Sequence, residues 1–286
     1  MNTTRDWEKP IRRMEFLMRL KSFPVAFKLL EDKEALYRRG IRYPISYAGA
    51  ETDVTNAFPE PYGGEGMVKR VRGKDNRIVL GVTGSIATGK TIVAKMLEEL
   101  GARTIDFDVL SRVVVEPGKP AWKDIVAYFG EQVLLEDKTL DRNKLREIVF
   151  RDFEKRKKLE DFQHPRIYEE FFKLVDQYAQ EDPDVVMQGV VPLLIEVNLQ
   201  PFFHNLLMVY APEEIQIKRL IERDGMTKEM AINMVRSQLS VEEKKGYCDL
   251  IIDNSGSLDE TRKQVGALWA QLKKIQQDQK ARSEEG

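Results

Sequence analysis

The sequence has little cysteine or histidine and no excess of charge of either sign. Among its 286 residues are one cysteine, Cys248, and two histidines, His164 and His204. One cysteine excludes an internal disulfide framework and a cysteine-rich zinc site, and two histidines are a poor supply for a His-based metal centre. Lys and Arg total 46 against 47 for Asp and Glu, a net charge of -1. No overall field attracts nucleic acid or anionic lipid, so any anion must be bound by a local site.

Long hydrophobic runs are also absent. No stretch approaches the roughly 18 consecutive apolar residues of a membrane span. The segment Met1–Leu20 is charged and lacks the apolar core of a signal peptide. We therefore expect a cytoplasmic protein with neither a membrane nor a nucleic acid as partner, and the sequence leaves its oligomeric state open.

Glycine and proline divide the chain near residue 76. We expect residues 1–76 to form an N-terminal extension, with short helices followed by an irregular linker, and we assign it no function. Translation could begin at Met1 or at the internal Met67. Residues 77–275 are expected to form one domain of ordinary size, and 276–286 a polar C-terminal tail.

After this boundary, short β-branched runs alternate with longer amphipathic segments. Strands are expected at Ile78–Val82, Arg103–Asp106, Asp184–Val190, Leu206–Tyr210 and Leu250–Ile252. Helices are expected at Lys90–Leu100, Pro120–Phe129, Arg142–Phe150, Pro165–Tyr178, Pro212–Arg223, Lys228–Gln238 and Leu258–Ile275. The alternation predicts an α/β fold with a parallel five-stranded sheet in three layers, and ligands at the carboxyl ends of its strands.

A phosphate-binding loop follows the first expected strand. The segment Gly84–Thr91 fits G-x-x-x-x-G-K-[ST] at every fixed position and leads into a helix. Its backbone N–H groups and the helix dipole are suited to polyphosphate. Lys90 is expected to reach the β and γ phosphates of ATP, and the Thr91 hydroxyl to ligate Mg²⁺.

The loop alone does not name the reaction. The N-K-x-D motif that recognises guanine is absent, because Asn143-Lys144 is followed by Leu145-Arg146. The expected strand 184–190 does not end in the Asp of a Walker B motif, which weakens an ATPase interpretation and leaves the second protein ligand of the metal unassigned. A kinase acting on a small acceptor is favoured.

Two aspartates follow the second expected strand. If the chain stays extended there, Asp106 and Asp108 lie on the same side. Asp108 is then the candidate base that orients an acceptor hydroxyl and takes its proton late in phosphoryl transfer. The alternative is that these aspartates only cap the helix that follows.

An ordered set of motifs between Ile78 and Leu272 resembles the dephospho-CoA kinase family. The matching elements are the loop Thr83–Thr91, Asp106-Phe107-Asp108 with Arg112, Val114–Gly118, His164-Pro165, Val191–Glu196, Lys218-Arg219-Leu220 with Arg223-Asp224, Arg236-Ser237-Gln238, and Asp249–Asn254 with Gly256. The resemblance implies a P-loop kinase fold with a helical acceptor-binding region and a lid that carries Arg219 and Arg223. It also implies ATP-dependent phosphorylation of the 3'-hydroxyl of dephospho-CoA, with ATP and Mg²⁺.

The resemblance also implies roles for individual residues. Asp108, Lys90 and Arg223 are the expected catalytic residues. The nucleotide would be bound by Gly84, Ser85, Ile86, Ala87, Thr88, Gly89, Lys90, Thr91, Ile92, Arg219, Asn254 and Gly256. The acceptor would be bound by Asp106, Asp108, Arg112, His164, Pro192 and Leu193, and the segment Val191–Glu196 would form part of the wall of the acceptor site. His164-Pro165 has an equal alternative as a simple helix start.

The chain departs from the family pattern in its phosphate loop. Ser85 and Ala87 replace glycines that are common there, which the loop geometry tolerates if their φ angles are negative. Val190 stands where many members carry Asp, so no carboxylate metal ligand is assigned there. Two alternatives stay open: a kinase of nucleotides or nucleosides, and a non-catalytic nucleotide-binding interaction protein.

Overall fold

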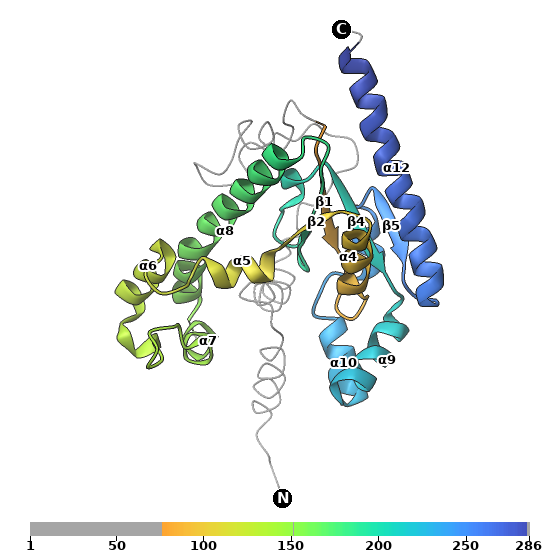
Figure 1. Ribbon diagram of the computed structural model, residues 1–286. Helices are drawn as coiled ribbons and strands as arrows, with labels where there is room; N and C mark the ends of the chain where they lie inside the picture. The colour runs from red at the N-terminus through yellow and green to blue at the C-terminus, as the bar shows by residue number, and fades with distance from the viewer. Residues whose placement is uncertain (1–75, 151, 285–286) are drawn as a thin grey trace, which may run out of the picture.

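A computed structural model describes residues 76–150 and 152–284 (Figure 1). The expected N-terminal extension, including Met67, lies outside the described residues, apart from Asn76. No helix in this described part is long and apolar enough to cross a membrane.

The centre of the fold is a five-stranded parallel sheet with strand order β2-β3-β1-β4-β5. The strands are β1 (Ile78–Thr83), β2 (Arg103–Asp106), β3 (Val186–Val190), β4 (Asn205–Tyr210) and β5 (Leu250–Asp253). The expected fold class and parallel sheet are confirmed, with strand boundaries shifted by no more than two residues. All six residues of β1 are buried, as expected for a strand in the middle of a three-layer fold.

Successive residues of β1 pack into different cores on the two faces of the sheet. Val79 belongs to the larger core, whereas Leu80 and Val82 belong to a second core. The second core is closed by α4 (Lys90–Glu99) and the long C-terminal helix α12 (Leu258–Glu284), which lie on the same face of the sheet in Figure 1. The alternation of side chains along a strand therefore gives each face of the sheet its own apolar layer.

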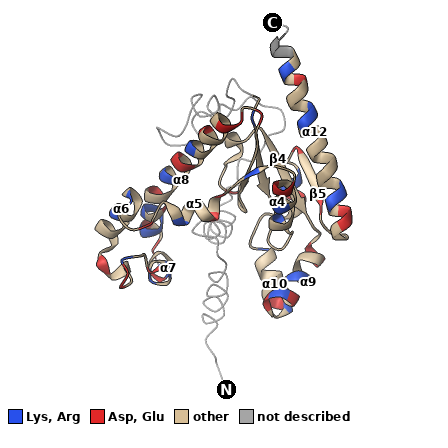
Figure 2. Cartoon of the chain, viewed as in Figure 1, with Lys and Arg blue, Asp and Glu red and all other residues tan. Residues whose placement is uncertain are grey.

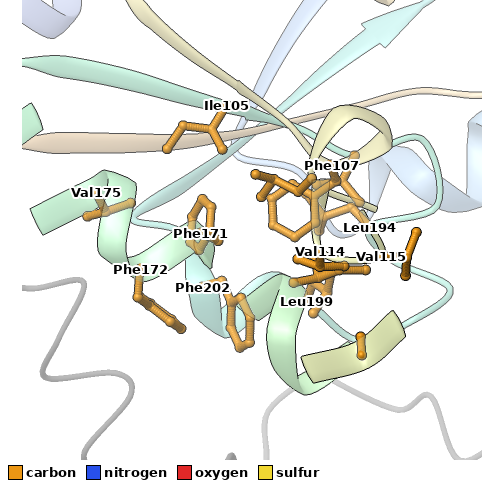
Figure 3. Packing of buried hydrophobic residues seen from close by; sticks show 14 of the residues in the cluster. Ile105, Phe107, Val114, Val115, Phe171, Phe172, Val175, Leu194, Leu199 and Phe202 are labelled. Atoms are coloured by element: carbon orange, nitrogen blue, oxygen red, sulfur yellow. The ribbon is translucent and has the colours of Figure 1, made fainter. Parts of the chain in front are cut away.

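The larger core is built around phenylalanines. Phe171 packs with ring-centroid distances of 5.0 Å to Phe107 and 5.2 Å to Phe172, and Phe172 lies 5.0 Å from Phe202 (Figure 3). Phe107 is the first residue of α5 (Phe107–Val113), and Phe171 and Phe172 come from α8 (Phe153–Glu181). These contacts fix the start of α5 against the rest of the molecule.

The remaining helices surround these cores. They are α6 (Pro120–Phe129), α7 (Arg142–Phe150), α9 (Glu213–Asp224), α10 (Lys228–Val235) and α11 (Val241–Lys245), with short 3₁₀ turns at Glu131–Val133 and Gln200–Phe202. Helices α9 and α10 pack together in a small third core with Ile86 of the phosphate loop. Figure 2 shows charged residues along α8 and α12, whereas the strands between them are mostly uncharged.

The expectation that a helix begins at His164-Pro165 is wrong. Helix α8 begins at Phe153, where the Asp152 side chain accepts a hydrogen bond from the Lys155 backbone N–H (3.1 Å), and Pro165 lies inside it. Proline inside a helix removes one backbone hydrogen bond. Packing of Phe171, Phe172 and other apolar residues on the larger core outweighs that local loss.

The polar segment after Ile275 continues α12 as far as Glu284. Gln276 is buried, and its side-chain amide donates hydrogen bonds to the backbone carbonyls of Asn76 and Asp184, both at 2.8 Å. These bonds join the C-terminal helix to the segments that precede β1 and β3. The sequence did not predict this extension because the segment is polar.

Candidate functional site

The phosphate loop lies between β1 and α4, at the carboxyl end of the central strand. Gly84 has φ +151° and Gly89 has φ +94°, and a Cβ at Gly84 would lie 2.5 Å from the Val209 carbonyl oxygen. Lys90 folds back over the loop, where its Nζ donates to the carbonyls of Gly84 (2.8 Å) and Ser85 (3.0 Å). The sequence motif thus forms the glycine-dependent turn that phosphate binding requires.

The two replaced glycines of the loop behave differently. Ala87 has φ +58°, in the left-handed region, whereas Ser85 does not have a positive φ. The condition of negative φ therefore fails at Ala87, where a side chain costs about 1–2 kcal/mol. The Ser85 hydroxyl instead donates to the Leu239 carbonyl at 3.2 Å.

Three side chains from later in the chain hold the loop, and we call Arg219, Gln238 and Asn254 the loop clamp. Arg219 donates to the carbonyls of Ala87 (3.2 Å) and Thr88 (3.3 Å) and, through its other terminal nitrogen, to that of Asn254 (2.6 Å). The buried Asn254 amide donates to the Thr88 carbonyl at 2.8 Å. The Gln238 side chain accepts from the Ile86 N–H at 2.9 Å. The expected lid residue Arg219 is therefore bonded to the loop itself.

The two aspartates do not lie on an extended chain. The strand ends at Asp106, whose carboxylate accepts the N–H of Asp108 at 2.8 Å and caps α5. The capping alternative is thus correct for Asp106, and the expected extended arrangement is wrong. Asp108 lies in the first turn of α5, where burial, helped by the charge of Asp106, raises its pKa to about 6.

Asp108 and Lys90 lie close enough to interact electrostatically. Each carries a charge that acts on the pKa of the other, and Arg112 also acts on Asp108. Burial lowers the pKa of Lys90 to about 7, and the neighbouring positive charge of Lys244 contributes to the same shift. Perturbed groups of opposite charge beside a phosphate loop are typical of a catalytic site.

The residues expected in the lid and on the acceptor side lie on several separate elements. Arg223 forms a bidentate ion pair with the adjacent Asp224 (2.7 and 2.8 Å), and its charge still acts on Lys90. The Pro192 carbonyl accepts from the Thr83 hydroxyl at 3.4 Å, whereas the Leu193 side chain is buried. His164 lies within α8, with its ring 6.0 Å from that of Tyr168.

The residues at the start of α4 fit a magnesium ion that is held mainly by substrate. Thr91 and Ile92 are exposed in the first turn, and the Thr91 hydroxyl makes no hydrogen bond to another described residue. The described residues contain no group of three or more His, Cys, Asp or Glu side chains that could hold a metal. Mg²⁺ in sites of this kind takes few protein ligands and completes its shell with phosphates and water, so the Thr91 hydroxyl fits the role of one protein ligand.

The other expected nucleotide-binding residue, Gly256, lies in the turn before α12, two positions after Asn254. Sequence reasoning assigned no individual role to Glu196, Gln238 or Lys244, although Glu196 and Gln238 lie in its matched motifs. Ser240 and Glu243 form a capping box at α11, and this pattern would have placed Lys244 on the face of α11 that also carries the buried Val241.

The parallel sheet, the phosphate loop after its central strand and the partly buried carboxylate that interacts electrostatically with the loop lysine define a P-loop kinase. The sequence profile of the dephospho-CoA kinase family matches residues 78–260. The dephospho-CoA kinase of Syntrophus aciditrophicus is 44% identical over 195 residues, which cover 68% of this chain and 83% of that protein.

Two solved structures are also similar to this chain. TT1252 from Thermus thermophilus is 29% identical with a TM-score of 0.57, covering 68% of this chain and 98% of that one. The dephospho-CoA kinase from Campylobacter jejuni is 27% identical with a TM-score of 0.50, covering 69% and 98%. The chain belongs to the dephospho-CoA kinase family. The resemblance carried by the sequence motifs and the expected enzyme class, a phosphotransferase that uses ATP, are therefore confirmed.

Proposed function

We propose that the chain transfers the γ-phosphoryl group of ATP to the 3'-hydroxyl of the ribose of dephospho-CoA, giving ADP and coenzyme A. The observation that carries this proposal is the position of Asp108, a partly buried carboxyl with a raised pKa whose charge interacts with Lys90 of the phosphate loop. Family membership supplies the identity of the acceptor.

Asp108 is the group that acts on the acceptor. Phosphoryl transfer passes through a loose transition state, so the base orients the hydroxyl and removes its proton late. With a pKa of about 6, Asp108 is mostly ionised at pH 7 and is a stronger base than an ordinary aspartate. The capped first turn of α5 and the Phe107 ring fixed in the larger core hold it in place.

Lys90 acts on the phosphates. In the structure its ammonium bonds to loop carbonyls, and a polyphosphate would replace these partners with charged oxygens. Mg²⁺, held by the Thr91 hydroxyl, would neutralise charge that develops on the phosphates. Arg219 and Arg223 on α9 add positive charge at the mouth of the loop, and closure of that helix over bound substrates would exclude water.

A coupled assay of ADP release from the full chain tests the proposal. ADP production should depend on dephospho-CoA, and a panel of nucleosides and nucleoside monophosphates should give little turnover. Turnover only with members of that panel would move the assignment to a nucleotide or nucleoside kinase. ATP binding without turnover on any acceptor would favour a nucleotide-binding interaction protein.

The role of Asp108 has its own test. Asp108→Asn should lower kcat by about 10²-fold or more while leaving the affinity for ATP within a small factor of the wild type, because only the base is removed. Lys90→Ala provides the complementary variant and should impair both ATP binding and turnover. Unchanged turnover in Asp108→Asn would overturn the assignment of the base.

A further inference from the structure

A buried ion pair lies outside the residues assigned to substrates. Lys244 Nζ, from α11, lies 2.7 Å from Glu196 Oε1, in the connection between β3 and β4, and both side chains are fully buried. Glu196 Oε2 has no hydrogen-bond partner among the described residues. Removing two charges from water costs several kcal/mol each, and an incompletely bonded carboxylate recovers only part of that cost. Stability alone therefore gives a poor account of the pair.

The contacts of the pair reach the acceptor side of the site. Lys244 Nζ also donates to the Pro192 carbonyl at 3.5 Å, and the Thr83 hydroxyl donates to the same oxygen at 3.4 Å. Thr83 is the last residue of β1, directly before the phosphate loop. Lys244 thus holds two points, Pro192 and Glu196, of the segment 191–196 that the family resemblance assigns to the acceptor wall.

On the other side, the contacts of the ion pair reach the phosphate loop. Helix α11 follows Gln238 and Leu239, which bond to Ile86 and Ser85 of the phosphate loop. The Ser240 capping box, in which the hydroxyl accepts from the Glu243 N–H at 3.1 Å, fixes the start of α11 and so the place of Lys244. The charges of both Lys244 and Glu196 also reach Lys90. A continuous set of contacts therefore runs from the phosphate loop, through the ion pair, to the acceptor wall.

We propose that Lys244 and Glu196 are positioning residues that hold the acceptor wall in register with the phosphate loop. The inference rests on the proposed function, since it assigns the pair to the alignment of dephospho-CoA with ATP. Neither residue is placed against reacting atoms. Two apolar side chains could fill the same volume. They could not replace Lys244 Nζ, which binds both the Pro192 carbonyl and the Glu196 carboxylate.

The test separates positioning from folding. Replacing a buried ion pair by apolar residues is often neutral or stabilising, so Lys244→Met/Glu196→Met is the central variant. Its control is Arg262→Met/Glu99→Met, which removes an exposed ion pair of 2.6 Å between α12 and the far end of α4. Thermal unfolding, the Kd for ATP, kcat and the KM for dephospho-CoA are measured for both variants and the wild type.

The buried double variant should unfold at or near the wild-type temperature and bind ATP within about threefold of the wild type. Its kcat should fall by about 10- to 100-fold and its KM for dephospho-CoA should rise, because a small misplacement of reacting groups costs that much. The control should keep wild-type kinetics. A folded variant with unchanged kcat and KM would overturn the inference.

A milder substitution covers the case in which the double variant does not fold. Glu196→Gln keeps the volume and one oxygen near Lys244 but removes the negative charge, and the same kinetic loss in a folded protein supports the inference. Wild-type kinetics in Glu196→Gln would overturn it. Failure of the proposed function has a different signature, because the wild-type chain itself would then show no turnover that depends on dephospho-CoA.

Discussion

Asp108 has a carboxyl group whose ionisation is set by its surroundings at the start of α5. Burial and the charge of Asp106 raise its pKa from near 4 to about 6. Because the base must be ionised to accept a proton, kcat/KM should fall as the pH is lowered through about 6, approaching tenfold per pH unit below it. A pH-rate profile between pH 5 and 8 measures this limb.

The same profile should lose its acid limb in Asp108→Asn, whose residual activity no longer depends on this carboxyl. A wild-type profile that stays flat down to pH 5 would show that the ionisation of Asp108 does not control the reaction. The DxD pattern allowed Asp108 to be predicted from sequence. The raised pKa could not be, because it depends on burial by residues that are distant in the chain.

Ala87 shows the cost of placing a side chain in a glycine conformation. Its φ of +58° costs about 1–2 kcal/mol, and Ala87→Gly removes that cost but loses a methyl group and gains unfolded-state entropy. We expect a net gain of about 0.5 kcal/mol in the free energy of unfolding, seen as a rise of about 1–2 °C in Tm. Ser85→Gly is the matched control and should lower Tm, because it removes the bond to Leu239 without relieving a positive φ. Equal effects of the two variants would contradict this account.

At the scale of elements, the connection between β5 and α12 holds the phosphate loop through Asn254. The Asn254 amide bonds to the Thr88 carbonyl, and its oxygen accepts from the buried Thr261 hydroxyl at 2.9 Å. Asn254→Ala leaves the Thr88 carbonyl with only the longer bond from Arg219 (3.3 Å) and the Thr261 hydroxyl with only its bond to the Ser257 carbonyl (3.2 Å). The free energy of unfolding should therefore fall by about 1 kcal/mol. The KM for ATP should rise as the loop loosens.

Gln264→Ala is the control for this variant. The Gln264 amide bonds to the backbone of Asp253 at the same connection, is half-buried, and makes no hydrogen bond to the described residues of the loop. It should leave the KM for ATP unchanged. A similar rise in KM for both variants would mean that the connection as a whole, rather than the clamp residue, controls the loop.

Helices and strands could be predicted from the sequence where a run or regular spacing of apolar residues marks them. The strands were located within two residues because strands buried on both faces are almost continuously apolar. Helix α11 was missed, and α5 was foreseen only in the alternative that the aspartates cap a helix, because both helices are short and depend on caps at Ser240 and Asp106. The start of α8 was misplaced because His164-Pro165 is locally a typical helix start, whereas tertiary packing allows the helix to begin at Phe153.

At the scale of the whole molecule, the order of the strands in the sheet determines which segments meet at the site. The sequence motifs indicated that Asp108 and the loop would meet, but β3 lies between β1 and β2, so the meeting depends on α5 rather than on adjacent strands. Asn254 follows Thr88 by 166 positions, and the pairing of Lys244 with Glu196 likewise spans separate elements. Such contacts leave no periodic signal in a single sequence. Family motifs therefore predicted candidate reacting residues, whereas the network of contacts around them required the fold.

The central claim is that this site phosphorylates the 3'-hydroxyl of dephospho-CoA. The most direct measurement is to incubate the full chain with ATP, Mg²⁺ and dephospho-CoA and to locate the transferred phosphate in the product by NMR. The account predicts one new phosphate, on the ribose 3'-oxygen, in a product identical to coenzyme A. A phosphate on any other oxygen, or ADP formed without phosphorylation of the acceptor, would contradict it.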